Sequence, residues 1–432
     1  PENQQKLGAR LQEAVAAFLD HTDDQIGRLV DGLRSMGELD NTVFVVLADN
    51  GASQEGGPFG VMHEMKFFNG IFEDGDAMID QLDDIGGPHS HTNYPWGWAQ
   101  CGNSPFKWYK QNTHEGGVHV PMIIHAPGTI DAANAGELRD QFVNVSDIVP
   151  TLYDLIGVIP PETYNGLEQL PVTGRSFSSV LGDADAPATN TLQYFEMGGS
   201  RALVHSVDGV AWKAVCKHTK DADYDSEPWE LYRLSDDWSE CHDLAAAEPD
   251  RLAALIDLWW EEAERHGVLP LDDRMFELFG ARFRDNSPHP ADMRYVYRPP
   301  MSPMPGQASA AIGGKSFDLT ARVTRTAGDE GVIYATGTEN SGVSIFIQHD
   351  RLVVDYNAFD KHTILESDVE IPAGDATLVV KLRRRAGKAG EMSVVVDGTP
   401  AGSADLDLFM RMMSSVGPSV AYDHGSAVSQ RY

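Results

Sequence analysis

The sequence lacks long hydrophobic runs, has few cysteines and is short of positive charge, and each shortage excludes a class of protein. No stretch of about eighteen apolar residues occurs, so no membrane span is predicted. Three widely separated cysteines, Cys101, Cys216 and Cys241, do not make a disulfide framework and predict buried or inert thiols. Lys and Arg number 33 against 65 Asp and Glu, and the net charge of −32 argues against a nucleic-acid or anionic-membrane partner.

The composition that remains is that of a globular protein. Hydrophobic residues make up 42% of the chain, which excludes a disordered protein, and the length favours about three domains. Near the beginning, apolar residues recur at helical spacing and stop near Gly37, which predicts an amphipathic helical region. Its apolar positions are Leu7, Leu11, Val15 and Phe18, followed by Ile26, Leu29, Val30 and Leu33.

An apolar run at residues 42–48 ends in Asp49-Asn50-Gly51. The run is rich in β-branched residues and does not alternate with polar ones, which predicts a parallel strand covered on both faces. Open α/β sheets bind ligands at the carboxyl ends of their strands, so we expect Asp49 and Asn50 in a crevice. Two adjacent oxygen donors suit Ca²⁺ or Mg²⁺ better than zinc. The alternative is that Asn-Gly is only a tight turn.

A second motif occupies residues 110–117 and precedes another apolar strand, predicted at 120–126. Lys110 opens this motif, which closes with Glu-Gly-Gly. We expect its ammonium at the same sheet edge as Asp49 and Asn50, where it suits an anion such as sulfate or phosphate. The alternative is a surface lysine before a glycine turn. His114, inside the motif, is a minor candidate for contacting a substrate oxygen or the leaving group.

Together, these motifs resemble the sulfatase family of the alkaline-phosphatase-like superfamily, and in particular the large bacterial arylsulfatases. The resemblance implies a sulfuric ester hydrolase that acts on a small-molecule sulfate ester. It implies that Asp49 and Asn50 bind a divalent metal, usually Ca²⁺ with Mg²⁺ as the alternative, and that Lys110 is the catalytic residue that binds the sulfate. The matching segments are residues 31–42, 47–51, 95–99, 104–110, 113–118, 146–152 and 229–232.

The sequence departs from the family at the nucleophile. Sulfatases use a formylglycine made from the first residue of a Cys/Ser-x-Pro-x-Arg motif, and the sequence contains no such motif. Cys101 lacks the proline two residues on, and Ser226-Glu227-Pro228 has Glu230 where arginine is required. The chain therefore resembles the carboxyl-terminal portion of a sulfatase, inactive alone, with its nucleophile outside it. An inactive remnant or binding module, and a phosphatase or phosphonate hydrolase of the same superfamily, remain as alternatives.

The expected fold class is α/β, with three parts. Residues 1–185 are predicted to form an incomplete, alkaline-phosphatase-like doubly wound sheet, since only two strong buried strands precede residue 150. Within this part, Ser146 is expected to cap a helix that Gly157 closes. Residues 186–285 are predicted to form a small antiparallel sheet and a helix whose apolar face includes Trp259.

The third expected part is a β-sandwich over residues 306–432. A proline-rich stretch at 298–306 marks the boundary, and short strands follow at 318–323, 331–335, 343–347, 352–356, 377–382 and 392–396. Asp397-Gly398 predicts a hairpin turn between strands. The pattern resembles the lectin-like or laminin-G-like module of large bacterial arylsulfatases. A structural cap is favoured over carbohydrate binding, because a fold alone does not give a function.

Overall fold

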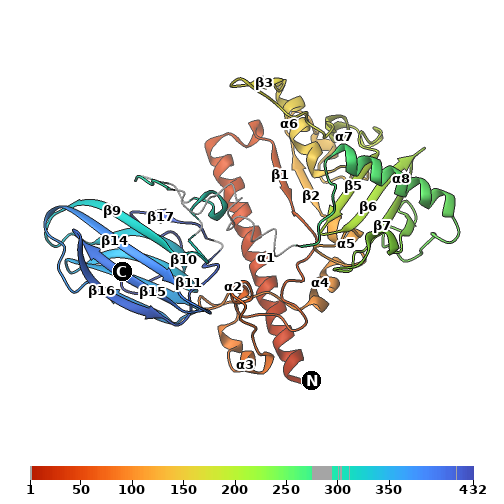
Figure 1. Cartoon of the computed structure of the whole chain (residues 1–432). Helices are drawn as coiled ribbons and strands as arrows, with labels where there is room; N and C mark the ends of the chain where they lie inside the picture. The colour runs from red at the N-terminus through yellow and green to blue at the C-terminus, as the bar shows by residue number, and fades with distance from the viewer. Residues whose placement is uncertain (1, 275–293, 300, 302–303, 311, 415) are drawn as a thin grey trace. The chain divides into compact units, whose positions relative to one another are not determined.

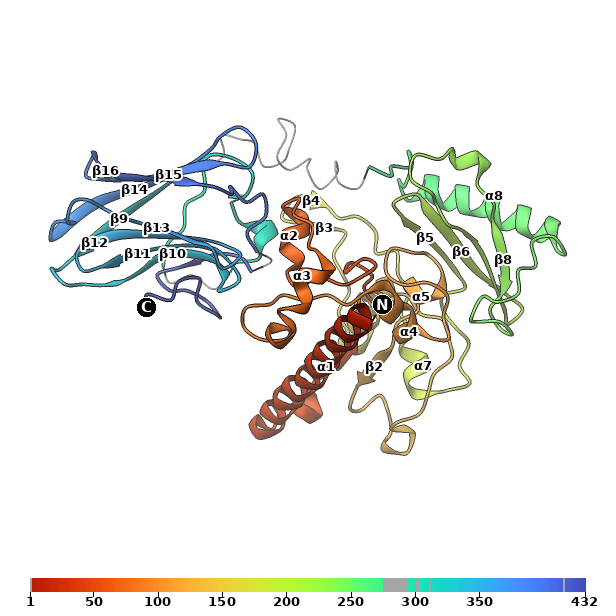
Figure 2. The same ribbon diagram turned by 90° about the horizontal axis from the view of Figure 1, so that it is seen from below.

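A computed structural model describes residues 2–274, 294–299, 301, 304–310, 312–414 and 416–432. The predicted proline-rich boundary at 298–306 lies partly outside these residues. Contacts divide the chain into two compact units, which are described separately. The first unit consists of residues 1–17, 55–96 and 276–432, and the second of residues 18–54 and 97–275. Figures 1 and 2 show the ribbon in two orthogonal views.

Helix α1, Glu2–Met36, confirms the predicted amphipathic helical region. Gly37, the predicted stop, has φ of +74°, a left-handed conformation that costs glycine little. In the first unit, Leu7 and Leu11 of this helix are fully buried in a small core that also contains Met62 and Ile85.

Strands β1, Phe44–Leu47, and β2, Met122–His125, form a two-stranded sheet. They pair antiparallel, with Leu47 opposite Met122. The prediction of a parallel strand covered on both faces at residues 42–48 is therefore wrong. Consecutive apolar residues indicate burial and not strand direction, and Ile123 on β2 is 68% exposed. The pairing places the end of β1 beside the beginning of β2.

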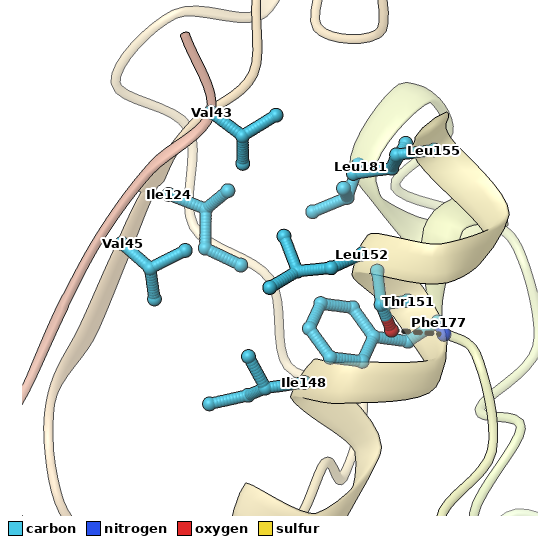
Figure 3. A pocket seen from close by; sticks show the side chains of 9 residues that line it. All are labelled: Val43, Val45, Ile124, Ile148, Thr151, Leu152, Leu155, Phe177 and Leu181. Carbon is cyan, nitrogen blue, oxygen red and sulfur yellow. Dashed lines mark hydrogen bonds between the residues drawn. The ribbon is translucent and has the colours of Figure 1, made fainter. Parts of the chain in front are cut away.

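One face of this sheet packs against helices α6, Ile148–Ile156, and α7, Ser178–Gly182. Figure 3 shows the small apolar pocket between them. Its only polar side chain is Thr151, whose Oγ1 accepts a hydrogen bond from the Phe177 backbone N–H at 3.0 Å. The pocket is a packing seam and carries no charged group. Its lining residues are Val43, Val45, Ile124, Ile148, Thr151, Leu152, Leu155, Phe177 and Leu181.

The turn before α6 is capped by Asn144, so the prediction of Ser146 as the cap is wrong. The Asn144 side chain accepts a hydrogen bond from the Ser146 backbone N–H. The Asp147 side chain accepts one from the Asn144 backbone N–H. This capping box starts the 3₁₀ turn η4, Val145–Asp147, which extends the helical segment beyond the predicted start. Gly157 closes α6 with φ of +68°, as predicted.

A four-stranded antiparallel sheet lies within residues 186–285, where a small antiparallel sheet is predicted. Its order is β5-β6-β7-β8, and helix α8, Pro249–Arg265, packs on one face (Figures 1 and 2). Trp259 of α8 is fully buried there, and its Nε1–H donates to Phe195 O at 3.1 Å. The strands are β5, Leu192–Met197, β6, Ser200–Val207, β7, Val210–Cys216, and β8, Glu230–Arg233.

In the first unit, two antiparallel sheets share one hydrophobic core. Their orders are β13-β12-β11-β10-β17 and β16-β15-β14-β9, and Figure 1 shows them as two layers. All six predicted strands overlap observed ones, and Asp397-Gly398 forms the predicted turn, with both φ values positive. The strands are β9, Phe317–Arg325, β10, Gly331–Thr338, β11, Ser341–Gln348, β12, Arg351–Ala358, β13, His362–Glu366, β14, Gly374–Arg384, β15, Gly390–Val396, β16, Thr399–Leu406, and β17, Ser419–Val420.

Short elements connect these parts. They are η1, Leu39–Asn41, α2, Glu64–Phe68, α3, Gly75–Ile79, η2, Leu82–Asp84, α4, Trp96–Asn103, α5, Glu115–Val118, η3, Ala132–Asn134, β3, Thr163–Tyr164, β4, Leu167–Glu168, η5, Tyr224–Ser226, and η6, Gly306–Ala308. In the described ranges, every helix is too short or too polar to cross a bilayer. The three cysteines are unbridged; Cys216 is buried, whereas Cys101 and Cys241 are exposed.

Candidate functional site

The two sequence motifs meet beyond the end of the β1–β2 sheet, within the second unit. The Gly51 N–H donates to Gly117 O at 3.1 Å, and the Lys110 N–H donates to Ala52 O at 3.1 Å. Because β2 runs opposite to β1, the residues that precede β2 lie beside the residues that follow β1. Residues 49–52, the Asp-Asn-Gly loop, and residues 107–117, the lysine loop, are therefore joined through their backbones.

Glycines allow the two loops to touch. A Cβ atom on Gly51 would lie 1.7 Å from Gly116 O, and a Cβ atom on Gly116 would lie 2.0 Å from Trp108 O. A Cβ atom on Gly117 would lie 1.9 Å from Asn112 O. Any larger residue at these positions would push the backbones apart. The glycines of both motifs are therefore required by close backbone approach.

Asn103, at the end of α4, fastens the loops to each other. Its Oδ1 accepts a hydrogen bond from the Ala52 N–H at 3.0 Å. Its Nδ2 donates to Gly116 O at 2.7 Å and to Trp108 O at 3.0 Å. One carboxamide thus bonds to three backbone segments. The sequence pattern does not single out Asn103, because its partners lie on two loops that only the fold brings together.

Asp49 and Asn50 are the predicted metal ligands. Asp49 is exposed and Asn50 is half-buried. The Asn50 Nδ2 donates to Gly51 O at 2.9 Å, so the donor side of this carboxamide is used within the loop and its oxygen is left as an acceptor. An adjacent carboxylate and carboxamide oxygen fit part of a Ca²⁺ shell, which takes about six to eight oxygens. Over the described ranges, no group of three or more His, Cys, Asp or Glu could hold a metal.

Lys110 is half-buried, and its loop has an unusual backbone. Trp108, two residues before it, has φ of +65°, and Gln111, directly after it, has φ of +70°. Residues other than glycine rarely adopt this left-handed conformation, which costs of order 1–3 kcal/mol each. The hydrogen bonds of Asn103 and of the Lys110 N–H hold the loop in this shape. The lysine therefore stands on a fixed segment.

His114 is 1% exposed, and its Nε2 lies 3.1 Å from Glu230 Oε2. The same oxygen lies 2.8 Å from Lys107 Nζ and accepts a hydrogen bond from the Tyr232 hydroxyl. The hydrogen bond from His114 lowers the pKa of Glu230; burial opposes this effect, and Lys107 and Tyr232 lower the pKa further. His114 Nδ1 is buried and has no hydrogen-bond partner among the described residues. Of the two ring nitrogens, only Nδ1 remains for the predicted substrate contact.

A buried ion-pair network anchors the Glu-Gly-Gly turn to strand β7. Lys213 Nζ lies 2.7 Å from Glu115 Oε1 and 3.0 Å from Glu240 Oε1. His119 Nδ1 lies 2.8 Å from Glu115 Oε2. Burial alone would raise the pKa of Glu115, but Lys213 and His119 outweigh it and lower the pKa to about 2. Glu115 is therefore a charged anchor at neutral pH, which the motif alone does not indicate.

Comparisons with known proteins find similarity to sulfatases. A sulfatase family model matches residues 2–158. The chain is 31% identical over 284 residues to the uncharacterized sulfatase PB10D8.02c of Schizosaccharomyces pombe, covering 64% of this chain and 48% of that protein. It is 29% identical over 178 residues to an arylsulfatase of Klebsiella aerogenes, covering 41% of this chain and 36% of that protein. The solved structure of Ps i-CgsB aligns with 19% identity and a TM-score of 0.38, over 60% of this chain and 45% of that chain.

The chain thus spans about half, or less, of the length of these curated relatives. The family match includes both motif loops, which lie between residues 49 and 117. Residues 2–158 thus match the sulfatase family, and the relatives named above are sulfatases.

Proposed function

We propose that this chain carries part of the active site of a sulfuric ester hydrolase of the arylsulfatase type. The hydrogen bond from the Lys110 N–H to Ala52 O carries the proposal, because it joins the two loops that hold the family's metal pair and its sulfate-binding lysine. Both loops lie inside the segment that matches the sulfatase family. The substrate class is a small-molecule sulfate ester.

In this proposal, Asp49 and Asn50 hold a divalent cation, Ca²⁺ or alternatively Mg²⁺. A bound cation would supply Lewis-acid polarisation of a sulfuryl oxygen. The Lys110 ammonium binds the sulfate and offsets the charge on its oxygens as the ester oxygen leaves. The contact with Glu230 fixes the ring of His114, so that Nδ1 faces one direction, and we assign this nitrogen to a substrate or leaving-group oxygen.

The nucleophile of this family is a formylglycine, and we propose that sequence outside residues 1–432 supplies it. No Cys/Ser-x-Pro-x-Arg motif occurs in the chain. We expect turnover only when a segment with that motif is present. We further propose that the two sheets between residues 317 and 420 are the lectin-like β-sandwich, with a structural role.

A non-catalytic sulfatase remnant or binding module is the second candidate function, and the missing nucleophile motif favours it. A phosphatase or phosphonate hydrolase of the same superfamily would use the same cation pair and lysine, because an ammonium is a point charge that accepts either anion. Phosphate and sulfate esters therefore belong in the same assay.

The experiment measures aryl-sulfate turnover by residues 1–432 with and without a segment that carries Cys-x-Pro-x-Arg. It also measures Ca²⁺ content and phenyl sulfate affinity, which need no nucleophile. We expect Asp49→Ala to reduce Ca²⁺ affinity and Lys110→Ala to reduce phenyl sulfate affinity, whereas the exposed control Asp40→Ala changes neither. Turnover without the added segment would contradict the proposal, as would a Lys110→Ala variant that binds phenyl sulfate normally.

A further inference from the structure

A second group of cations lies next to the lysine loop, in the same unit. Lys217, directly after β7, has its Nζ 3.3 Å from the centroid of the Trp108 ring. Lys107, directly before Trp108, has its Nζ 2.8 Å from Glu230 Oε2 and 3.0 Å from the Tyr232 hydroxyl. Lys107 and Trp108 precede Lys110 by three and two positions in the sequence. Lys217 is distant in sequence but contacts Trp108.

Positive charge exceeds negative charge in this group. Glu230 is shared by Lys107, His114 and Tyr232. Lys217 forms no ion pair with any carboxylate of the described residues, and the ring of Trp108 is its close contact. Two ammonium groups therefore face one carboxylate that is already engaged. In a chain with a net charge of −32, such a local excess of positive charge is suited to an anion.

Lys217 is exposed to solvent, yet its surroundings partly disfavour its charge. Burial lowers the pKa of Lys217; the Glu230 carboxylate opposes this effect, and Lys107 lowers the pKa further. An added anion would relieve the cost, because an opposite charge nearby favours the charged ammonium. The alternative is that the lysine only covers the tryptophan ring with its hydrocarbon stem.

The ring under Lys217 is held in place. Trp108 has a left-handed backbone, and its carbonyl oxygen accepts a hydrogen bond from Asn103 Nδ2 at 3.0 Å. Its ring meets the ring of Tyr109 edge-on, with centroids 5.8 Å apart. A cation over the face of such a ring is attracted by the ring quadrupole and keeps a defined position. Lys217 therefore has a defined position over the ring of Trp108, which stands two residues before Lys110 in the sequence.

We propose that Lys217, seated on Trp108, is an anion-binding subsite for a second negative group of the substrate. The substrate class is then a sulfate ester whose ring also carries a carboxylate or a further sulfate. The inference rests on the proposed function, in which Lys110 binds the sulfate that is removed. Lys217 acts as a specificity residue: it binds the retained anion and takes no part in bond cleavage.

The test is isothermal titration calorimetry of the full chain in Ca²⁺-containing buffer with phenyl sulfate and with 4-carboxyphenyl sulfate. We expect the dianionic probe to bind about fivefold more tightly, the size of an exposed ion pair. Lys217→Gln should remove this preference and leave phenyl sulfate affinity unchanged, and Lys217→Arg should restore it. The control Lys220→Gln, three residues along, should keep the preference, and circular dichroism should show that all variants are folded.

A Lys110→Ala arm separates the two proposals. If Lys110→Ala weakens both probes and Lys217→Gln leaves the dianion preference intact, the subsite is overturned and the proposed function stands. If Lys217→Gln removes the preference and Lys110→Ala changes nothing, the subsite stands and the sulfate assignment of Lys110 fails. If neither probe binds the folded wild-type chain, both proposals are overturned.

Discussion

Leu47 and Met122 lie opposite each other at the paired ends of two antiparallel strands. Leu47 ends β1 and Met122 begins β2, so the Asp-Asn-Gly loop leaves the sheet at the place where the lysine loop enters it. In a parallel pair, the residues preceding the second strand would lie at the opposite edge. The direction of pairing is therefore what joins the two motifs.

Replacing Gly51 should separate the two loops. A Cβ atom there would lie 1.7 Å from Gly116 O, so Gly51→Ala should destabilise the chain by about 1–3 kcal/mol and weaken Ca²⁺ binding. The control is Gly27→Ala in helix α1, where nothing lies within 4 Å of the added atom and a gain of about 0.5–1 kcal/mol is expected. Urea unfolding and Ca²⁺ titration measure both effects. Equal stability of the two variants would contradict the close-approach argument.

Removing the buried ammonium of Lys213 should strongly destabilise the protein. Lys213→Met leaves the buried carboxylates of Glu115 and Glu240 without their shared ammonium, which costs about 3–5 kcal/mol. Urea unfolding measures the loss. The triple variant with Glu115→Gln and Glu240→Gln added should recover part of it, because no charge then remains buried. A triple variant less stable than Lys213→Met would show that the ion pairs are not the cause.

The same network predicts that the free energy of unfolding falls in acid. The pKa of Glu115 is lowered from 4.5 to about 2 in the folded chain, so its contribution is complete above pH 4.5 and is lost as the pH falls towards 2. Glu115→Gln should therefore flatten the fall in unfolding free energy between these pH values. The exposed control Glu38→Gln should keep the wild-type slope. If wild type and Glu115→Gln lose the same unfolding free energy between pH 4.5 and 2, Glu115 is not the group responsible.

Asn69 should fasten the segment 55–96 to the two-sheet part of its own unit. Its side chain is almost fully buried; Nδ2 donates to Met65 O at 2.7 Å and to Met412 O at 2.8 Å, and Oδ1 accepts from the Arg411 N–H at 2.6 Å. Asn69→Ala leaves buried backbone groups unpaired, at a cost of about 1–3 kcal/mol. Hydrogen exchange should then speed up at residues 411–412. The exposed control Asn41→Ala should leave this exchange unchanged. Unchanged exchange in Asn69→Ala would exclude the fastening role.

The sequence predicts local structure well and long-range relations poorly. Helix α1 and its stop at Gly37, strands β5 to β8, and the turn at Asp397 follow from periodicity and turn chemistry within a few residues. Strand direction does not, because the same apolar run suits either direction. The Ser146 cap failed for a related reason, since an additional 3₁₀ turn moved the start of the helical segment to Asn144.

The supporting residues of the site could not be predicted from the sequence, because their partners are distant in the chain. Asn103 bonds to a residue 51 positions away, Lys213 to one 98 positions away, and Glu230 to one 116 positions away. No local pattern marks these partners. Asp49, Asn50 and Lys110 could be proposed because they stand in short motifs, and their roles remain predictions until binding is measured.

The most direct test of the central claim is the linkage between cation and sulfate binding. If the Asp-Asn-Gly loop and the lysine loop form one site, Ca²⁺ should increase the affinity of the chain for phenyl sulfate, and phenyl sulfate should increase the affinity for Ca²⁺ by the same factor. Asp49→Ala and Lys110→Ala should each abolish this mutual increase. Equal phenyl sulfate affinity with and without Ca²⁺ in the folded wild-type chain would contradict a shared site.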